Sequence, residues 1–552
     1  MLQPNTENIH ILNFDHFFHV AIHLNVAYAM GWWRSNADDE IFFSSILTIL
    51  IGIFVVLWLA VKKQKKVTVP PLPPGPRGLP IVGYLPFVGT ELHTKFQQLC
   101  GIYGPIYKVW LGNKMSIVIS SPSLVKEVVR DQDAIFSNRD TNIVGRIISY
   151  GGAGIALSSN GPEWKMLRKI FVREMLSPSN LDNTFALRRE EIRNTIINVF
   201  EKKGTHIDLG DLAFVTVMNA IMNMLWGGML RGEEGAKFGA KFKHIFAELV
   251  LILGRPNVSD LFPALACFDL QGIERKAKRI FETIDGVLDY AIDKQIKSLA
   301  KAKEEGMTKT GQKDFLQVLL ELREQDEGAP SMSMTQIKAL VFDTVTATTD
   351  TTTTMSEWVM ARLLKHPKIM RKVTEELTEI VGLDNLVEES HLPKLHYLEA
   401  VIKETFRLHP AFPFLLLRTP RESSIIGGYH VPKDSSIYLH IWAIQRDPKY
   451  WDNPLEFKPE RFLNNAYGRF DYSGNNFKYL PFGSGRRICA GLALGERTLK
   501  YILASLLHSY EWKLPQGSEI EFSDTFGLVT KRKNPTIAIP TPRLSKAELY
   551  TK

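Results

Sequence analysis

Cys489 lies near the end of a glycine-rich stretch, residues 481–491, whose sequence is PFGSGRRICAG. Good helix formers fill residues 492–507, so we expect this cysteine to lie where a loop becomes a helix. The helix dipole and the unpaired backbone N–H groups favour negative charge there, and the thiolate is the form of cysteine that binds metals. Three glycines leave space for a flat macrocycle beside the sulfur. A lone cysteine that packs as a small buried apolar side chain is the alternative.

Asp350 and Thr351 form a second pair that could do chemistry, a carboxylate next to a hydroxyl within a threonine-rich run at residues 344–354. Locally, the β-branched residues favour a strand. The flanks instead predict one long buried helix, opened by the capping box Ser333-x-x-Gln336 and ended before Pro367. Threonine hydroxyls can bond to the carbonyl one turn back in such a helix. Proton transfer and a core helix with one exposed aspartate both remain open for this pair.

Other side chains could hold an anionic ligand or build the core. Trp164 and Arg168 lie one helical turn apart and only donate, which suits a carboxylate, although a tryptophan packed under a solvated arginine is the alternative. Glu404 and Arg407 lie at i and i+3 in a largely apolar helix. A buried ion pair needs further partners, and Arg461 is the candidate third member.

The elements that must position these residues are mostly helical. Residues 106–111 and 116–120 alternate as strands on either side of a turn at 112–114, which predicts an early hairpin. The longest helical patterns cover residues 187–200, 273–303 and 335–364. The sequence therefore predicts a mainly α fold with a minor β region, in the α+β class.

Composition excludes several classes of protein. The chain has 552 residues, three scattered cysteines and a formal net charge of +8. So few cysteines exclude a disulfide framework, and the absence of a basic stripe with interleaved aromatics argues against nucleic-acid binding. The modest basic excess suits an acidic protein partner instead.

An uncharged apolar run at residues 41–61 has the length of a single transmembrane helix. Acidic residues precede it and four lysines follow it, so the positive-inside rule places an N-terminal extension, residues 1–40, in the lumen. Residues 62–78 are expected to form a basic, proline-rich hinge, and residues 79–552 a cytosolic body. The sequence therefore predicts a lipid bilayer as one partner of the chain.

The pattern Phe482-x-x-Gly485-x-Arg487-x-Cys489-x-Gly491 resembles the haem-binding loop of the cytochrome P450 family, with every fixed position filled. The resemblance implies that residues 79–552 are a haem-thiolate monooxygenase domain with the cytochrome P450 fold, in which Cys489 is the axial ligand of the iron of haem b. It also implies that the haem is bound by Trp164, Arg168, Arg418, Phe482, Gly485, Arg487 and Gly491.

The same resemblance assigns roles to the other motifs. Asp350 and Thr351 match the acid–alcohol pair of the family's oxygen-activating helix, which relays protons, although the family most often has glycine where this chain has Thr348. The family's structural triad behind the haem is matched by Glu404, Arg407 and Arg461. A pocket for a lipophilic substrate is expected to be lined by Ile147, Ile148, Ala347, Phe412, Leu415 and Phe526.

Residues 480–487, LPFGSGRR, are typical of plant microsomal A-type members, and residues 107–114 and 172–177 resemble the subgroup that contains the cotton δ-cadinene hydroxylase. This resemblance implies hydroxylation of a sesquiterpene or related terpenoid at the endoplasmic reticulum membrane, with dioxygen (O2) and with electrons from NADPH through a cytochrome P450 reductase. Because relatives of the subgroup also oxidise flavonoids, a flavonoid or phenolic hydroxylase is the alternative. Two other classes are a haem-thiolate isomerase or dehydratase, which needs no reductase, and a non-enzymatic membrane adaptor.

Overall fold

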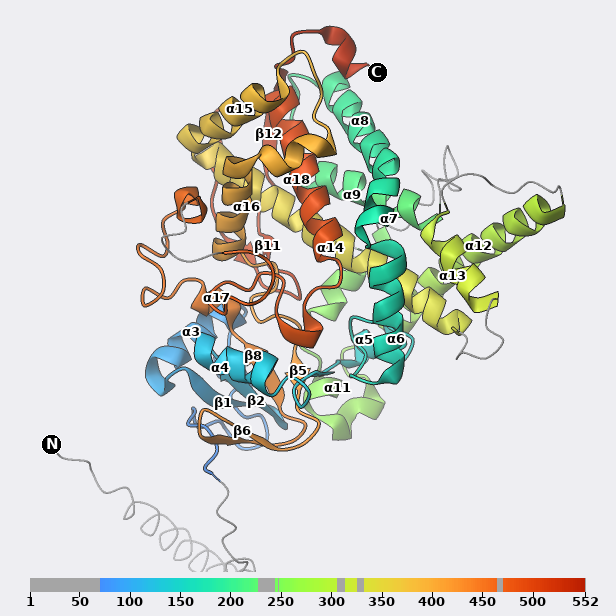
Figure 1. Ribbon diagram of the computed structural model, residues 1–552. Helices are drawn as coiled ribbons and strands as arrows, with labels where there is room; N and C mark the ends of the chain where they lie inside the picture. The colour runs from blue at the N-terminus through green and yellow to red at the C-terminus, as the bar shows by residue number, and fades with distance from the viewer. Residues whose placement is uncertain are drawn as a thin grey trace, which may run out of the picture. The chain divides into compact units, whose positions relative to one another are not determined.

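The computed structural model describes residues 70–226, 244–246, 248–304, 313–324, 332–463 and 470–551 (Figure 1). The expected extension at 1–40, the expected membrane span at 41–61 and the first part of the hinge lie outside these residues. Among the described residues, one helix is long and apolar enough to cross a bilayer, α9 (Leu209–Trp226), and most of it is buried in the protein. We therefore treat α9 as a core helix.

Helices dominate the described chain, as the sequence predicts. The long helices are α8 (Phe185–Glu201), α9, α12 (Ile273–Glu304), α14 (Met334–Lys365), α15 (Pro367–Val381), α16 (His396–Leu408) and α18 (Leu492–Ser509). The shorter ones are α3 (Leu92–Tyr103), α4 (Pro122–Lys126), α5 (Ile143–Ile148), α6 (Pro162–Ile170), α7 (Pro178–Asn183), α11 (Val258–Leu261), α13 (Phe315–Glu324) and α17 (Ile441–Ile444). The three longest helical patterns in the sequence correspond to α8, α12 and α14.

A five-stranded sheet with the order β1-β2-β8-β5-β3 forms the main β region. β1 (Ile106–Leu111) pairs antiparallel with β2 (Lys114–Ile119) across a turn at residues 112–113, which confirms the predicted hairpin. β2 runs parallel to β8 (Ser436–Leu439), and β5 (Arg418–Thr419) joins β8 to β3 (Asn138–Arg139). The register of the last pair sets Arg139 opposite Arg418, which brings two cationic side chains together.

The remaining strands form smaller sheets that close the body. One has the order β4-β12-β9, with β4 (Ile207–Asp208), β12 (Ile537–Pro542) and β9 (Tyr510–Lys513). Two hairpins complete the set, formed by β6 (Ser424–Ile426) with β7 (Tyr429–Val431) and by β10 (Asp524–Thr525) with β11 (Lys531–Arg532).

Helix α14 runs through the middle of the described body (Figure 1). Its first turn is closed by the predicted capping box: the Gln336 N–H donates to the Ser333 hydroxyl at 3.2 Å, and the Ser333 N–H donates to the Gln336 side chain at 2.9 Å. The helix continues through the threonine-rich run to Lys365 because most of its side chains are buried and it packs against α9, α16 and α18. The prediction of one long buried helix is confirmed, and packing overrides the local preference for a strand.

Candidate active site

The loop that carries Cys489 is shaped by two glycines with positive φ, Gly483 at 73° and Gly485 at 68°. A Cβ atom on Gly485 would lie 2.1 Å from the Val129 carbonyl oxygen, so only glycine fits at that position. The Cys489 N–H donates to the Phe482 carbonyl at 2.9 Å, and α18 begins at Leu492. Cys489 therefore lies at a junction of loop and helix, as the sequence predicts.

The Cys489 side chain is exposed, which argues against a small apolar side chain packed in the core. Burial by the surrounding protein nevertheless raises the pKa of the Cys489 thiol. The Gly491 backbone N–H and Arg168 both lower this pKa, but their effect is smaller than that of burial. The backbone N–H thus favours the thiolate, as expected at this junction, but does not outweigh burial. A metal cation bound to the sulfur would supply the charge that stabilises the thiolate.

Four buried or half-buried arginines gather around this loop, namely Arg139, Arg168, Arg418 and Arg487. Burial, Arg418 and Arg168 together lower the pKa of Arg487 to about 9. Asp133 is the carboxylate that pairs with Arg418, at 3.2 Å. A single carboxylate leaves most of this positive charge without a counter-ion, so the arrangement fits a ligand with two carboxylates, as in the propionates of haem. The sequence did not predict that Arg139 belongs to this group.

Trp164 and Arg168 come together with Arg487. The Arg487 guanidinium carbon lies 4.1 Å from the centre of the Trp164 ring, a cation–π contact. The indole N–H donates to the Ile155 carbonyl at 3.1 Å, and Arg168 donates to the Ile488 carbonyl at 2.7 Å. A guanidinium has five donors, so both arginines keep N–H groups for a propionate, whereas the single N–H of Trp164 is already used.

The other predicted haem-binding residues frame the same loop. The Phe482 ring packs 5.2 Å, between centroids, from Phe406 of α16. A Cβ atom on Gly491 would lie at an ordinary contact distance, 3.9 Å, from the Cys489 sulfur. Arg418 donates to the Ser484 carbonyl at 3.0 Å. The residues predicted to bind haem thus surround one loop, and their contact with the cofactor stays a prediction.

The predicted threonine back-bonding occurs along α14. Thr344 and Thr351 each donate at 2.7 Å to the carbonyl four residues earlier, and Thr346 does so at 2.8 Å. The acceptor for Thr351 is the carbonyl of Ala347, and Ala347 is exposed on a helix that is otherwise largely buried. This turn of α14 therefore faces open space, where a bound molecule could contact the Thr351 hydroxyl.

Asp350 is buried and forms an ion pair with Lys531 of β11. Burial raises the pKa of the Asp350 carboxyl, and Lys531 lowers it. The Lys531 side chain is 41% exposed, so the pair connects a buried carboxylate to solvent. This placement excludes the alternative of an exposed aspartate on a core helix. Lys531 carries no local signal in the sequence, because it lies far along the chain on a two-residue strand.

A second carboxylate of α14, Asp343, was also missed. Its Oδ2 atom accepts from the Ile155 N–H at 2.6 Å and from the Ala156 N–H at 3.0 Å. Burial raises the pKa of the Asp343 carboxyl to about 6. A Cβ atom on Gly154 would lie 2.2 Å from the same oxygen, so this close approach requires glycine. Asp343 thus ties α14 to the loop whose Ile155 carbonyl accepts from Trp164.

The predicted ionic triad is assembled in the core. Arg407 makes a bidentate contact with Glu404, with distances of 2.6 and 2.8 Å, and Arg461 lies 3.4 Å from the same carboxylate. All three side chains are almost fully buried. Arg407 also donates to the Gln445 carbonyl at 2.8 Å, so the network has the further partners that a buried ion pair needs.

The residues predicted to line a substrate pocket fall into different hydrophobic clusters. Ile147 and Ile148 pack with the cluster of α9, α12 and α14, and Phe412 with the cluster of α16 and α18. Leu415 packs with the cluster of β2 and β8, and Phe526 with the cluster of α3 and β1. Their meeting in one pocket with Ala347 stays a prediction.

Comparison with known proteins gives consistent matches over most of the chain. The family model described as Cytochrome P450 matches residues 73–539. A flavonoid 3′-monooxygenase of Crocosmia x crocosmiiflora is 38% identical over 513 residues, which cover 91% of this chain and 98% of that protein. A flavonoid 3′,5′-hydroxylase of Campanula medium is 35% identical over 486 residues, covering 86% and 92% of the two chains. A solved zebra fish cytochrome P450 with progesterone aligns with a TM-score of 0.70 and 25% identity, covering 82% of this chain and 99% of that one.

Proposed function

The chain belongs to the cytochrome P450 family, and from this premise we propose that it hydroxylates a flavonoid or a related phenolic compound. Members of this family are haem-thiolate monooxygenases that take electrons from NADPH through a reductase. The observation that supports the proposed substrate class is the likeness to flavonoid monooxygenases over about nine-tenths of the chain. These relatives favour the flavonoid alternative over the terpenoid substrate expected from the sequence, and they give no support to the cotton δ-cadinene hydroxylase subgroup.

The haem, when bound, would supply the activation of dioxygen, and the Cys489 thiolate would bind its iron. Arg168, Arg418 and Arg487 would hold its carboxylates, because their positive charges exceed the local negative charge. Because Arg418 and Arg487 are buried and Arg168 is half-buried, such ion pairs would be stronger than in water.

The residues on α14 would handle protons. The Thr351 hydroxyl faces the exposed turn at Ala347, where it can donate to or accept from a bound molecule. Asp350 and Lys531 would carry protons between solvent and this turn, since Lys531 is partly exposed and Asp350 is buried. The monooxygenase relatives also argue against an isomerase or a dehydratase that needs no reductase.

The location of the enzyme is part of the proposal. The apolar run at 41–61 followed by lysines supports a single span that holds the body on the cytosolic side of the endoplasmic reticulum membrane. A membrane-bound reductase would then deliver electrons to the same side of the membrane.

The test is a substrate panel in microsomes that contain the full chain, a cytochrome P450 reductase and NADPH. Hydroxylated products are expected from flavonoids, and products formed only from sesquiterpenes would overturn the proposal. Cys489→Ala should abolish turnover and the thiolate-type absorption of the CO complex. The matched control, Cys267→Ala, removes an exposed cysteine and should leave both unchanged.

A further inference from the structure

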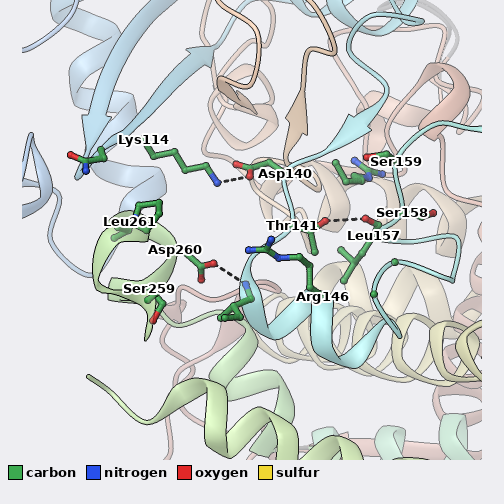
Figure 2. Close-up of a pocket in the computed structure, with 17 residues that line it drawn as sticks. Lys114, Asp140, Thr141, Arg146, Leu157, Ser158, Ser159, Ser259, Asp260 and Leu261 are labelled. Carbon is green, nitrogen blue, oxygen red and sulfur yellow. Dashed lines mark hydrogen bonds and ion pairs between the residues drawn. The ribbon is translucent and has the colours of Figure 1, made fainter. Parts of the chain in front are cut away.

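A cavity of about 640 Å³ lies among segments that are distant in the sequence (Figure 2). Its walls come from the turn between β1 and β2, from α5 and the residues before it, from the loop at 151–159, and from α11 with the helical turn after it. The volume is in the range of ordinary small-molecule sites. None of the residues that line this cavity is aromatic. Shape and polar groups would therefore select its occupant, because no ring is available for stacking.

Several polar groups in the wall already have partners. Lys114 forms an ion pair with Asp140, and Asp140 also accepts from the Ser436 hydroxyl at 2.5 Å. Thr141 donates to the Leu157 carbonyl at 2.9 Å. These contacts hold the segments of the wall together and leave little hydrogen-bonding capacity for a ligand.

Arg139, which also lines the cavity, already donates to the Ala156 and Leu416 carbonyls, whereas two other charged side chains remain available. The side chain of Arg146, on α5, is exposed and makes no hydrogen bond or ion pair with any residue in the described part of the chain. Asp260 of α11 accepts from the Ile143 N–H at 2.8 Å through one carboxylate oxygen, which leaves the other oxygen free to accept. Figure 2 shows the Arg146 side chain reaching toward the space between Asp260 and the pair of Lys114 with Asp140. The cavity thus presents a donor and an acceptor to the same space.

We propose that this cavity is a second ligand site, which binds the hydroxyl and carbonyl groups of a polyhydroxylated phenolic substrate before oxidation. Arg146 donates to a ligand carbonyl or phenolic oxygen, and Asp260 accepts from a phenolic hydroxyl. A terpene hydrocarbon satisfies neither group, because it has neither a hydrogen-bond donor nor an acceptor. The inference rests on the proposed flavonoid hydroxylation and adds a site that would select for it.

Residues in the wall of the cavity also contact residues of the candidate active site. Ser158 lines the cavity, and its backbone carbonyl accepts from Arg487 at 2.6 Å. Ile143 of α5 also lines the cavity, whereas Ile148, at the other end of the same helix, is buried in the cluster that includes α14. Arg139 also lines the cavity and lies opposite Arg418 in the pairing of β3 with β5, so the cavity directly borders the arginines around the Cys489 loop.

The test compares two flavanones, one hydroxylated and one without hydroxyl groups, in the holoenzyme with reductase and NADPH. Arg146→Gln and Asp260→Asn should each raise KM for the hydroxylated flavanone, by roughly tenfold for the loss of one charge-assisted hydrogen bond. Both variants should leave the kcat for the hydroxylated flavanone unchanged, and also the KM for the flavanone without hydroxyl groups. The control is Arg421→Gln, which removes an exposed arginine that does not line the cavity. Equal effects on the two flavanones, or no effect on either, would overturn the proposal.

A separate binding measurement keeps this inference distinct from the proposed function. If the wild-type enzyme oxidises no flavanone, the proposed function fails, and calorimetry with the hydroxylated flavanone then decides the second site. Binding that is weakened in Arg146→Gln but not in Arg421→Gln supports the site. Binding that is absent, or equal in the two variants, rules it out.

Discussion

Asp343 offers the sharpest test of how α14 is connected to the haem-binding side of the molecule. A single oxygen of its carboxylate accepts from both Ile155 and Ala156, at 2.6 and 3.0 Å. Asp343→Asn keeps one oxygen of the same size, so both hydrogen bonds can persist without the charge. Asp343→Leu keeps the branched shape of the side chain but removes the acceptor, which leaves two backbone N–H groups unpaired.

The magnitudes follow from burial. The pKa of Asp343 is raised from its ordinary value of 3.8 to about 6, which disfavours the ionised form by roughly 3 kcal/mol. The native state therefore binds more protons than the unfolded chain between about pH 4 and pH 6, so the free energy of unfolding falls as pH rises through that window. Above about pH 6 the native state carries the full free-energy cost of the ionised, buried carboxylate. Asp343→Asn should remove this pH dependence; Asp343→Leu should remove it too, but should cost roughly 2–6 kcal/mol relative to Asp343→Asn for two unpaired donors.

The assay is thermal unfolding of the holoenzyme between about pH 4 and pH 7, combined with amide hydrogen exchange of a peptide that covers residues 154–158. Exchange in this peptide should be unchanged in Asp343→Asn and much faster in Asp343→Leu. Asp182→Asn, on an exposed carboxylate of α7, is the control and should preserve the wild-type pH dependence. If Asp343→Asn exposes the peptide as much as Asp343→Leu does, the hydrogen bonds do not hold the loop and the reasoning is refuted.

Three further changes have defined outcomes. Thr351→Ala removes the hydroxyl at the exposed turn of α14 and should increase NADPH consumed per product with little change in KM; unchanged coupling would contradict a role in proton transfer. Lys531→Met removes the counter-ion of Asp350 and raises its pKa further, so the acid limb of the pH–rate profile should move to higher pH; a profile that stays in place would exclude the pair from catalysis. Gly485→Ala should prevent accumulation of haem-loaded protein, whereas Gly101→Ala, at an exposed helical position with open space, should not; normal haem content in the first variant would show that the loop can adjust.

The parts of the fold that could be predicted have causes within a few residues. Ser333 and Gln336 close a helix end by contacts three residues apart, and Pro367 prevents the helix from continuing. The hairpin of β1 and β2 follows from strand alternation around Gly112, whose φ is 61°. In each case the sequence contains both partners of the interaction side by side, so the pattern and the structure agree.

The missed residues depend on contacts between distant segments. Arg139 reaches Arg418 only through the pairing of β3 with β5, and Asp133 becomes the counter-ion of Arg418 only in the folded chain. The Cys489 thiol shows the same limit, because a local rule predicts a lowered pKa and burial by the rest of the protein raises it. Local sequence identifies the group that can react, whereas the ionisation of that group is set by the whole fold.

The threonine-rich centre of α14 shows how a helix can persist where the local residues favour a strand. Asp343 and Asp350 are seven residues apart and therefore lie on nearly the same face of the helix, on either side of the exposed Ala347. Asp343 holds the loop at 155–156, and Asp350 holds β11 through Lys531, so charged contacts fix the helix on both sides of this turn. Because these contacts and the buried apolar side chains stabilise α14, the turn between them does not need good helix formers. Threonine at position 351 costs little there, and it places a hydroxyl where the proposed chemistry requires one.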